Sequence, residues 1–366
     1  MNKRKTLFFL ILILAVCKSK SVVAAVDDSL KGNANSKFLI FPFFLRSPET
    51  NWGFGSVAAY FFKAKKNDPR IRTSDINLVT LLTLRDQVVG IMGGNVYFPE
   101  EKAIIRLQTS YSYYPDKSWG IGNNTYQTAQ EGYSVKQFYF NPQFLVKVVR
   151  NWYVGFTYEL QNIHDFIYDA NGVFDQQNIN GRYGGMVSGP GMLVTWDTRN
   201  NAFSPSKGLF TELNVTSFNK YTGSDFDFTT LTFDLRKFIL VSRARVLGFQ
   251  FFLKSNSGKV SFRNLSMLGG PEMMRGYYKG RYIDDDMFVF QAELRQYLFW
   301  RIGVAAFAGT GEVFPRINKL RLDGLHYAGG AGVRLMVSKS EKLNLRIDYG
   351  VGENSNGLYV ILKEAF

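Results

Sequence analysis

Apolar and polar side chains alternate along this chain from residue 37 almost to its last residue. In residues 343–349 the odd positions are Leu, Leu, Ile and Tyr, and the even positions are Asn, Arg and Asp. A β-strand points successive side chains to opposite faces, so this segment has one apolar face and one polar face. The pattern recurs at 152–160, 209–216, 231–236 and 288–295, which predicts an all-β protein.

Two all-β architectures satisfy such alternation. A soluble sandwich buries the apolar face in a core, whereas a membrane barrel turns it to lipid and encloses the polar face. Aromatic residues make up 16% of the chain and gather near expected strand ends at 111–114, 152–153 and 297–300, as they do at membrane interfaces. Together with an export signal, they favour a transmembrane antiparallel β-barrel.

Residues 1–25 have the features of a secretory signal peptide. Basic residues at 3–5 precede an apolar run at 7–16, and alanines at 24–25 offer a cleavage site. The apolar run is too short to cross a membrane as a helix. A weak likeness to a lipoprotein processing site keeps lipidation of Cys17 open as an alternative.

After a short N-terminal segment at 26–36, residues 37–366 are expected to form the barrel. The alternation predicts sixteen strands, an even number that lets the barrel close with both chain ends on one side. Turns such as 150–151 are short, whereas the loops at 114–132, 162–187, 255–285 and 311–326 are long, which is typical of the outer side of such barrels. The expected strands are 37–45, 52–63, 75–85, 87–98, 102–113, 133–148, 151–161, 188–197, 208–218, 224–238, 241–254, 286–298, 301–310, 327–338, 342–350 and 356–364.

Several motifs carry a family resemblance. Residues 268–278 read Leu-Gly-Gly-Pro-Glu-Met-Met-Arg-Gly-Tyr-Tyr, residues 291–295 read Gln-Ala-Glu-Leu-Arg, and residues 307–311 read Phe-Ala-Gly-Thr-Gly. An Arg-Gly-Tyr in a long loop, at this distance from a Glu-x-Arg strand and the chain end, is a specific signal. The chain resembles the bacterial surface antigen (BamA/TamA-like) family of outer-membrane barrels over nearly its whole mature length, most strongly over 188–366.

The resemblance implies a sixteen-stranded barrel whose long sixth outer loop folds back into the lumen. The loop motif would be Arg275, Gly276 and Tyr277, with Arg275 paired to acids on the following strands. Glu293 matches one such acid. The family's second acid falls at Gly309, so we expect that partner to be missing.

The family usually carries periplasmic POTRA domains ahead of the barrel. This sequence shows none, so it resembles a short, barrel-only branch.

The residues support an inward loop independently of the resemblance. Strand parity places Glu293 and Arg295 on the lumen face. On the next strand the lumen positions 303, 305, 309 and 311 are small, which leaves a groove for a loop. A charge-assisted Arg275–Glu293 bond is therefore expected, with a solvated Arg275 as the alternative.

Further charged residues fall on the lumen face at Arg334, Arg346 and Asp348. We expect them to form a structural network that fills and polarises the interior. A selectivity lining for a pore is the alternative.

A seam is expected between the first and last strands. Pro42 cannot donate a ladder hydrogen bond and so favours a sheet edge, although it could also lie harmlessly at an interface or bulge. The last strand ends on Phe366, with Glu364 expected near its aqueous edge.

No enzymatic constellation stands out. The chain has two histidines, His164 and His326, and neither has a convincing nucleophile or carboxylate partner in the sequence. No metal site or cofactor is expected, and Asp284–Asp286 is interpreted as a solvated loop.

The sequence therefore predicts an outer-membrane barrel of a Gram-negative bacterium that acts in protein insertion or translocation through its seam. A passive pore or structural barrel without client handling is the alternative. The excess of 44 Lys and Arg over 30 Asp and Glu fits anionic lipid or a protein partner better than nucleic acid. Expected partners are outer-membrane lipid, other barrel proteins, a periplasmic subunit or a second copy in a homodimer.

Overall fold

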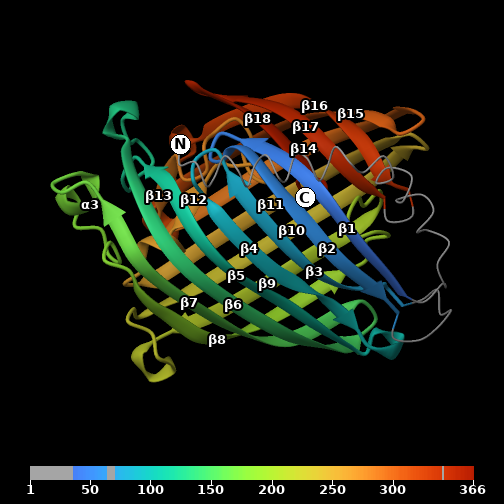
Figure 1. Ribbon diagram of the computed structural model, residues 1–366, viewed down its shortest axis with the longest axis horizontal. Coiled ribbons are helices and arrows are strands. Elements are labelled where there is room, and N and C mark those ends of the chain that lie inside the picture. Colours follow the sequence, from blue (N-terminus) through green and yellow to red (C-terminus); the bar gives the residue numbers. More distant parts are fainter. Residues whose placement is uncertain (1–35, 64–70, 340–341) are drawn as a thin grey trace, which may run out of the picture.

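The computed structural model describes residues 36–63, 71–339 and 342–366. They form a closed barrel of sixteen antiparallel strands, which confirms the predicted fold class (Figure 1). The strands follow one another in chain order, except that β12 and β13 form a separate two-stranded sheet and β11 pairs directly with β14. The signal peptide and Cys17 lie outside the described residues.

The barrel strands are β1 (Ser36–Ser47), β2 (Asn51–Phe62), β3 (Ser74–Thr83), β4 (Val88–Tyr97), β5 (Ala103–Ser118), β6 (Glu131–Val149), β7 (Trp152–Tyr168), β8 (Gly185–Asp197), β9 (Gly208–Phe218), β10 (Phe228–Ser242), β11 (Arg245–Gly258), β14 (Asp286–Phe299), β15 (Ile302–Phe314), β16 (His326–Ser338), β17 (Leu343–Gly352) and β18 (Ser355–Leu362). The small sheet consists of β12 (Ser266–Leu268) and β13 (Tyr282–Asp284). One short helix, α3 (Val173–Gln176), and the 3₁₀ turn η5 (Phe262–Asn264) lie in the long loops.

Some strand ends differ from the sequence prediction. Strands β5, β6 and β7 run further into the loops than expected, so the predicted loops at 114–132 and 162–187 shrink to 119–130 and 169–184. The turn between β10 and β11 lies at 243–244, because exposed apolar residues at 239–241 continue β10. Strand β18 ends at Leu362, two residues earlier than predicted.

The two faces of the wall have opposite chemistry. On β14, Phe290 and Leu294 are exposed while Gln291 and Glu293 are buried. On β17, Ile347 is exposed while its neighbours Arg346 and Asp348 are fully buried. An apolar outer face and a polar inner face are what a membrane barrel requires, since lipid surrounds the outside. Within the described residues, no helix is both long and apolar enough to cross a bilayer.

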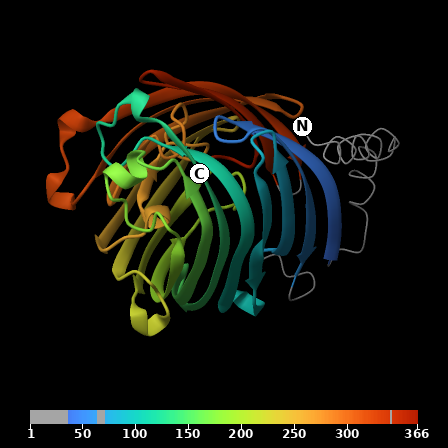
Figure 2. The same ribbon diagram turned by 60° about the vertical axis from the view of Figure 1, so that its left-hand side comes forward.

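The two ends of the barrel also differ. One end, here called the turn end, carries the connections 98–102, 150–151, 198–207, 243–244 and 300–301, together with the described residues Lys339 and Lys342 between β16 and β17. The other, the loop end, carries 119–130, 169–184, 219–227, 259–285 and 315–325. The loop end is at the left in Figure 1, where α3 is labelled, and Figure 2 brings it forward. Long loops place this end on the outer side of the membrane.

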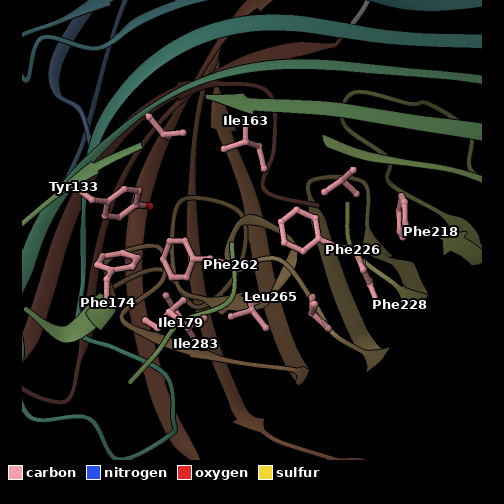
Figure 3. Close-up of a cluster of buried hydrophobic side chains, with 13 residues drawn as sticks. Tyr133, Ile163, Phe174, Ile179, Phe218, Phe226, Phe228, Phe262, Leu265 and Ile283 are labelled. Atoms are coloured by element: carbon pink, nitrogen blue, oxygen red, sulfur yellow. The ribbon is translucent and has the colours of Figure 1, made fainter. Parts of the chain in front are cut away.

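Aromatic and aliphatic side chains pack together at the loop end (Figure 3). Phe262 of η5 lies 4.9 Å from Phe174 of α3 and 5.5 Å from Tyr133 of β6, measured between ring centroids. Ile283 of β13 belongs to the same buried cluster. This packing fixes both the start and the end of the segment between β11 and β14.

Candidate functional site

The segment between β12 and β13 lies against the inner faces of the last strands. The Gly276 N–H donates to the Tyr359 hydroxyl over 3.0 Å, and the Ser355 hydroxyl donates to the Gly276 carbonyl over 2.7 Å. The Tyr359 hydroxyl also donates to the Tyr277 carbonyl over 3.1 Å. The tip of the loop is therefore bonded to β18, one of the two strands that close the barrel.

Glycines let the loop backbone approach β17 closely. A Cβ on Gly350 would lie 2.5 Å from the Arg275 carbonyl oxygen, and one on Gly352 would lie 2.6 Å from the Tyr277 ring. Gly276 itself has a backbone φ of 124°, an angle that residues other than glycine rarely adopt. The sequence prediction placed the groove on β15, whereas most of it lies on β17. On β15, Gly309 makes room for Met274, whose sulfur would lie 3.2 Å from an added Cβ.

Arg275 is buried between two carboxylates. Its Nη2 lies 2.6 Å from Glu293 Oε2, an ion pair without good hydrogen-bond geometry, and its Nη1 donates to Asp348 Oδ2 over 2.6 Å. The guanidinium carbon also lies 3.6 Å from the centroid of the Phe307 ring, a cation–π contact. The expected Arg275–Glu293 contact is present in this geometry.

Arg275 has a second carboxylate after all, which corrects one expectation. The resemblance pointed to a position on β15, where Gly309 stands and no partner is possible. Asp348 supplies the carboxylate from β17, two strands further along the chain. Strand parity had placed Asp348 in the lumen, but only the closing of the barrel brings it to Arg275.

The other predicted lumen charges join the same cluster. Arg295 lies 2.6 Å from Glu293, and Arg346 lies 2.7 Å from Asp348. Arg334 reaches Glu293 at 3.3 Å and also pairs with Asp348. The Arg346 guanidinium in addition donates to the Pro271 carbonyl over 2.7 Å, so the cluster holds the loop at a second point.

The chain end contradicts the sequence prediction for Phe366 and Glu364. After β18 the backbone turns at Lys363, whose φ is 77°, and enters the lumen. Glu364 is buried and accepts a hydrogen bond from Arg334 over 2.8 Å, instead of lying at an aqueous edge. Phe366 is not at the seam: its ring lies 6.3 Å from that of Phe238, and its main-chain oxygen accepts from Arg295.

The tail (residues 363–366) leaves the strand because the Glu364 carboxylate pairs with two arginines in the barrel lumen. Its carboxylate lies 3.7 Å from Arg295 as well as 2.8 Å from Arg334. It completes a cluster of four arginines and three carboxylates: Arg275, Arg295, Arg334, Arg346, Glu293, Asp348 and Glu364. A buried cluster of this kind requires nearly complete pairing, because an unpaired buried charge is costly.

The contact between β1 and β18 is short. Their register consists of the single pair Arg46↔Val360, whereas β1 and β2 are in register at twelve pairs and β17 and β18 at eight. Pro42 lies on β1, exposed, opposite Ser56 of β2.

The loop also reaches the other side of this contact. The Lys279 N–H donates to Glu49 Oε1 over 2.7 Å, and Glu49 lies in the turn between β1 and β2. Glu49 is buried, and burial raises the pKa of its carboxyl above the ordinary value. The loop thus binds β18 through Gly276 and the β1–β2 turn through Lys279.

The histidines take structural places in the described chain. The ring of His326 stacks on Tyr282 with 3.7 Å between centroids, and its Nε2 lies 3.1 Å from the Asn123 carbonyl oxygen. His164 lies on β7 beside Tyr111, with 6.2 Å between ring centroids. Across the described ranges, no group of three His, Cys, Asp or Glu side chains is arranged to hold a metal ion.

Comparisons with known proteins agree with this architecture. The profile of the Omp85 superfamily domain matches residues 91–357. No curated protein sequence matches the chain.

Solved structures share the fold at low identity. BamA from Haemophilus ducreyi lacking POTRA domains 1–3 has a TM-score of 0.59 and 11% identity, covering 90% of this chain and 70% of that one. CdiB from Escherichia coli has a TM-score of 0.60 and 10% identity, covering 88% and 62%. CdiB from Acinetobacter baumannii has a TM-score of 0.54 and 10% identity, covering 90% and 60%. The chain therefore spans about 60–70% of the length of these structures.

Proposed function

Because this chain belongs to the Omp85 superfamily of Gram-negative outer-membrane barrels, we propose that it inserts or translocates proteins through the seam between β1 and β18. The superfamily is one of outer-membrane protein insertion and secretion. In this proposal the barrel is a non-enzymatic device, and its partners are client proteins, with a periplasmic subunit or a second copy as further partners.

The observation that carries the proposal is the single residue pair between β1 and β18. Each ladder hydrogen bond adds to the cost of separating two strands, so this junction opens more easily than the neighbouring junctions with eight and twelve pairs. Opening it exposes two strand edges, which are templates for an incoming strand.

The position of the loop supports the idea that the loop controls whether the seam opens. It is bonded to β18 at Gly276 and to the β1–β2 turn at Lys279, so it bridges the two sides where the strands themselves are barely paired. The Arg275 cluster holds the loop in this place. Release of Arg275 would remove the bridge and leave the single strand pair to hold the seam.

A disulfide across the seam tests the proposal. Arg46→Cys and Val360→Cys occupy the one observed register pair, and oxidation would lock them together. The matched control is Phe44→Cys with Phe54→Cys, a pair that joins β1 to β2 and leaves the seam free. We expect oxidation of the seam pair alone to lower the amount of client barrels in the outer membrane, measured by quantitative mass spectrometry.

An unchanged outer-membrane proteome with a fully formed seam disulfide would overturn the proposal. If Arg346→Gln then changed single-channel conductance in planar bilayers, the barrel would be a passive pore instead. Conductance would report this because Arg346 lies on the lumen face and is part of the charged cluster.

A further inference from the structure

The exposed charges of the barrel are distributed unevenly between its ends. At the turn end, exposed basic residues occur on or next to five connections between β4 and β17, with Arg245 as the first residue of β11: Lys102, Arg150, Lys207, Arg243, Arg245, Lys339 and Lys342. Two exposed carboxylates are described there: Glu100, which lies 3.1 Å from Lys102, and Glu272 of the lumen loop, which lies 3.1 Å from the exposed Lys363. This set of basic side chains is called the basic ring below.

The loop end has no such excess. Its exposed bases are accompanied by a slightly larger number of exposed acids: the bases are Lys220, Lys259, Lys279, Arg316, Lys319 and Arg321, and the acids are Asp86, Asp165, Asp169, Asp225, Asp227, Asp323 and Glu353. The positive charge of the described surface is therefore concentrated at one end. A sequence-wide net charge does not reveal this, because it averages both ends.

Exposed aromatic residues border the basic ring on the outer wall. Trp152 and Trp196 stack with 5.2 Å between ring centroids at the ends of β7 and β8. Trp300 is 65% exposed in the turn beside Arg301, whose guanidinium lies 5.8 Å from its ring. Tryptophan at this level marks the boundary between hydrocarbon and headgroups, so the adjacent bases lie at the depth of lipid headgroups.

We propose that the basic ring binds the anionic headgroups of phospholipids in the leaflet at the turn end. The ring is spread along the turn end from β4 to β17 and lies directly beyond the aromatic boundary, as a membrane surface requires. For binding an acidic protein, we would instead expect a compact patch of basic residues on one side of the barrel. Bound anionic lipid would fix the depth and tilt of the barrel without any contact to the seam.

Quenching by brominated lipids tests this in the full-length barrel reconstituted into bilayers. Five tryptophans are present, and a Trp52→Phe background removes the one on the loop-end outer wall, while Trp119 is buried. Fluorescence of the remaining tryptophans then reports lipid at the turn end. The probes are dibrominated phosphatidylglycerol and dibrominated phosphatidylcholine, each titrated into unbrominated phosphatidylcholine.

A basic residue near an anionic surface contributes a factor of about five in binding. We expect phosphatidylglycerol to be preferred by about that factor at low salt, and the preference to disappear in 1 M salt, where the Debye length is about 3 Å. Arg150→Gln/Arg243→Gln/Lys339→Gln should abolish the preference. The matched variant Lys220→Gln/Lys259→Gln/Lys319→Gln removes equal charge from the loop end and should keep it.

Heat-modifiable gel mobility establishes that each variant is folded. Equal quenching by both lipids at low salt in the parent protein would overturn the proposal and leave the ring as a surface for an acidic protein. Loss of the preference in both triple variants alike would also overturn it, because net charge rather than the ring would then be responsible.

Discussion

Removing one charged side chain from the Arg275 cluster should lower the free energy of unfolding by an amount that depends strongly on the sign of the charge removed. The cluster has four arginines and three carboxylates, a net charge of one positive unit. Arg275→Met replaces one arginine by an apolar chain and leaves three of each sign. Asp348→Asn leaves four arginines with two carboxylates, and Arg346 then has no other carboxylate at salt-bridge distance in the described chain.

The magnitudes follow from this pairing. Arg275→Met loses bonds to charged partners, and every remaining ion keeps a partner, so we predict a loss of about 2 kcal/mol in the free energy of unfolding. Asp348→Asn leaves the buried Arg346 without a carboxylate, which typically costs about 3–5 kcal/mol in the free energy of unfolding. The double variant should cost less than the sum, because Arg275 is one of the three arginines that Asp348 pairs with.

Equilibrium urea unfolding in lipid vesicles, followed by tryptophan fluorescence and heat-modifiable gel mobility, measures these differences. The reasoning fails if Arg275→Met costs as much as Asp348→Asn, or if the two losses add fully in the double variant. Either result would mean that charge pairing does not set the stability of the cluster.

Three further predictions concern the tail, the groove and the loop. Glu364→Gln should lower the free energy of unfolding by about 2–3 kcal/mol, because Arg334 and Arg295 lose a buried carboxylate. The control Lys363→Gln, at the exposed neighbouring residue, should change the free energy of unfolding by no more than about 0.5 kcal/mol. Equal losses in the two variants would contradict the burial of the tail. Gly350→Ala should displace the loop and speed its cleavage by added protease, since the new Cβ would lie 2.5 Å from the Arg275 carbonyl oxygen. In the control Gly329→Ala the nearest atom would be 3.4 Å from the new Cβ. Equal cleavage rates in the two variants would refute the close packing of the loop. Asp284 is buried, contrary to the solvated loop expected for Asp284–Asp286, and burial raises its pKa from 3.8 to about 6. The folded loop therefore binds a proton more readily than the unfolded loop and should gain stability as pH falls from about 6 to about 4. Loop proteolysis at pH 7 and pH 4.5 checks this, and Asp284→Asn should reduce the difference.

Local pattern was enough to predict the barrel. Alternation depends only on neighbouring residues, so segments such as 343–349 gave both the strand and the face of each side chain. It also placed Glu293, Arg295, Arg334, Arg346 and Asp348 on the lumen face, where they are buried. What alternation does not contain is which lumen residues meet across the barrel, because that depends on closure and register.

Asp348 and Phe366 show where this limit lies. The family resemblance implied a carboxylate on β15, where this chain has Gly309, whereas Asp348 on β17 reaches the same arginine. Alternation predicted a strand over 356–364, but the charge of Glu364 competes with strand pairing and the chain turns inward after Leu362. The charged Glu364 among apolar residues was the sequence signal for this turn. It could be interpreted correctly only together with the lumen arginines that pair with it.

Hydrogen exchange of the β18 amides tests the central claim most directly, namely that the loop holds the seam where the strands hardly pair. In Arg275→Met, we predict that the amides of residues 355–362 exchange at least about tenfold faster than in the parent protein, which corresponds to about 1.4 kcal/mol of lost protection. The amides of β9 and β10, which share eleven register pairs, should be unchanged. Unchanged exchange in β18, with the loop released as shown by faster proteolysis of 269–281, would contradict the account.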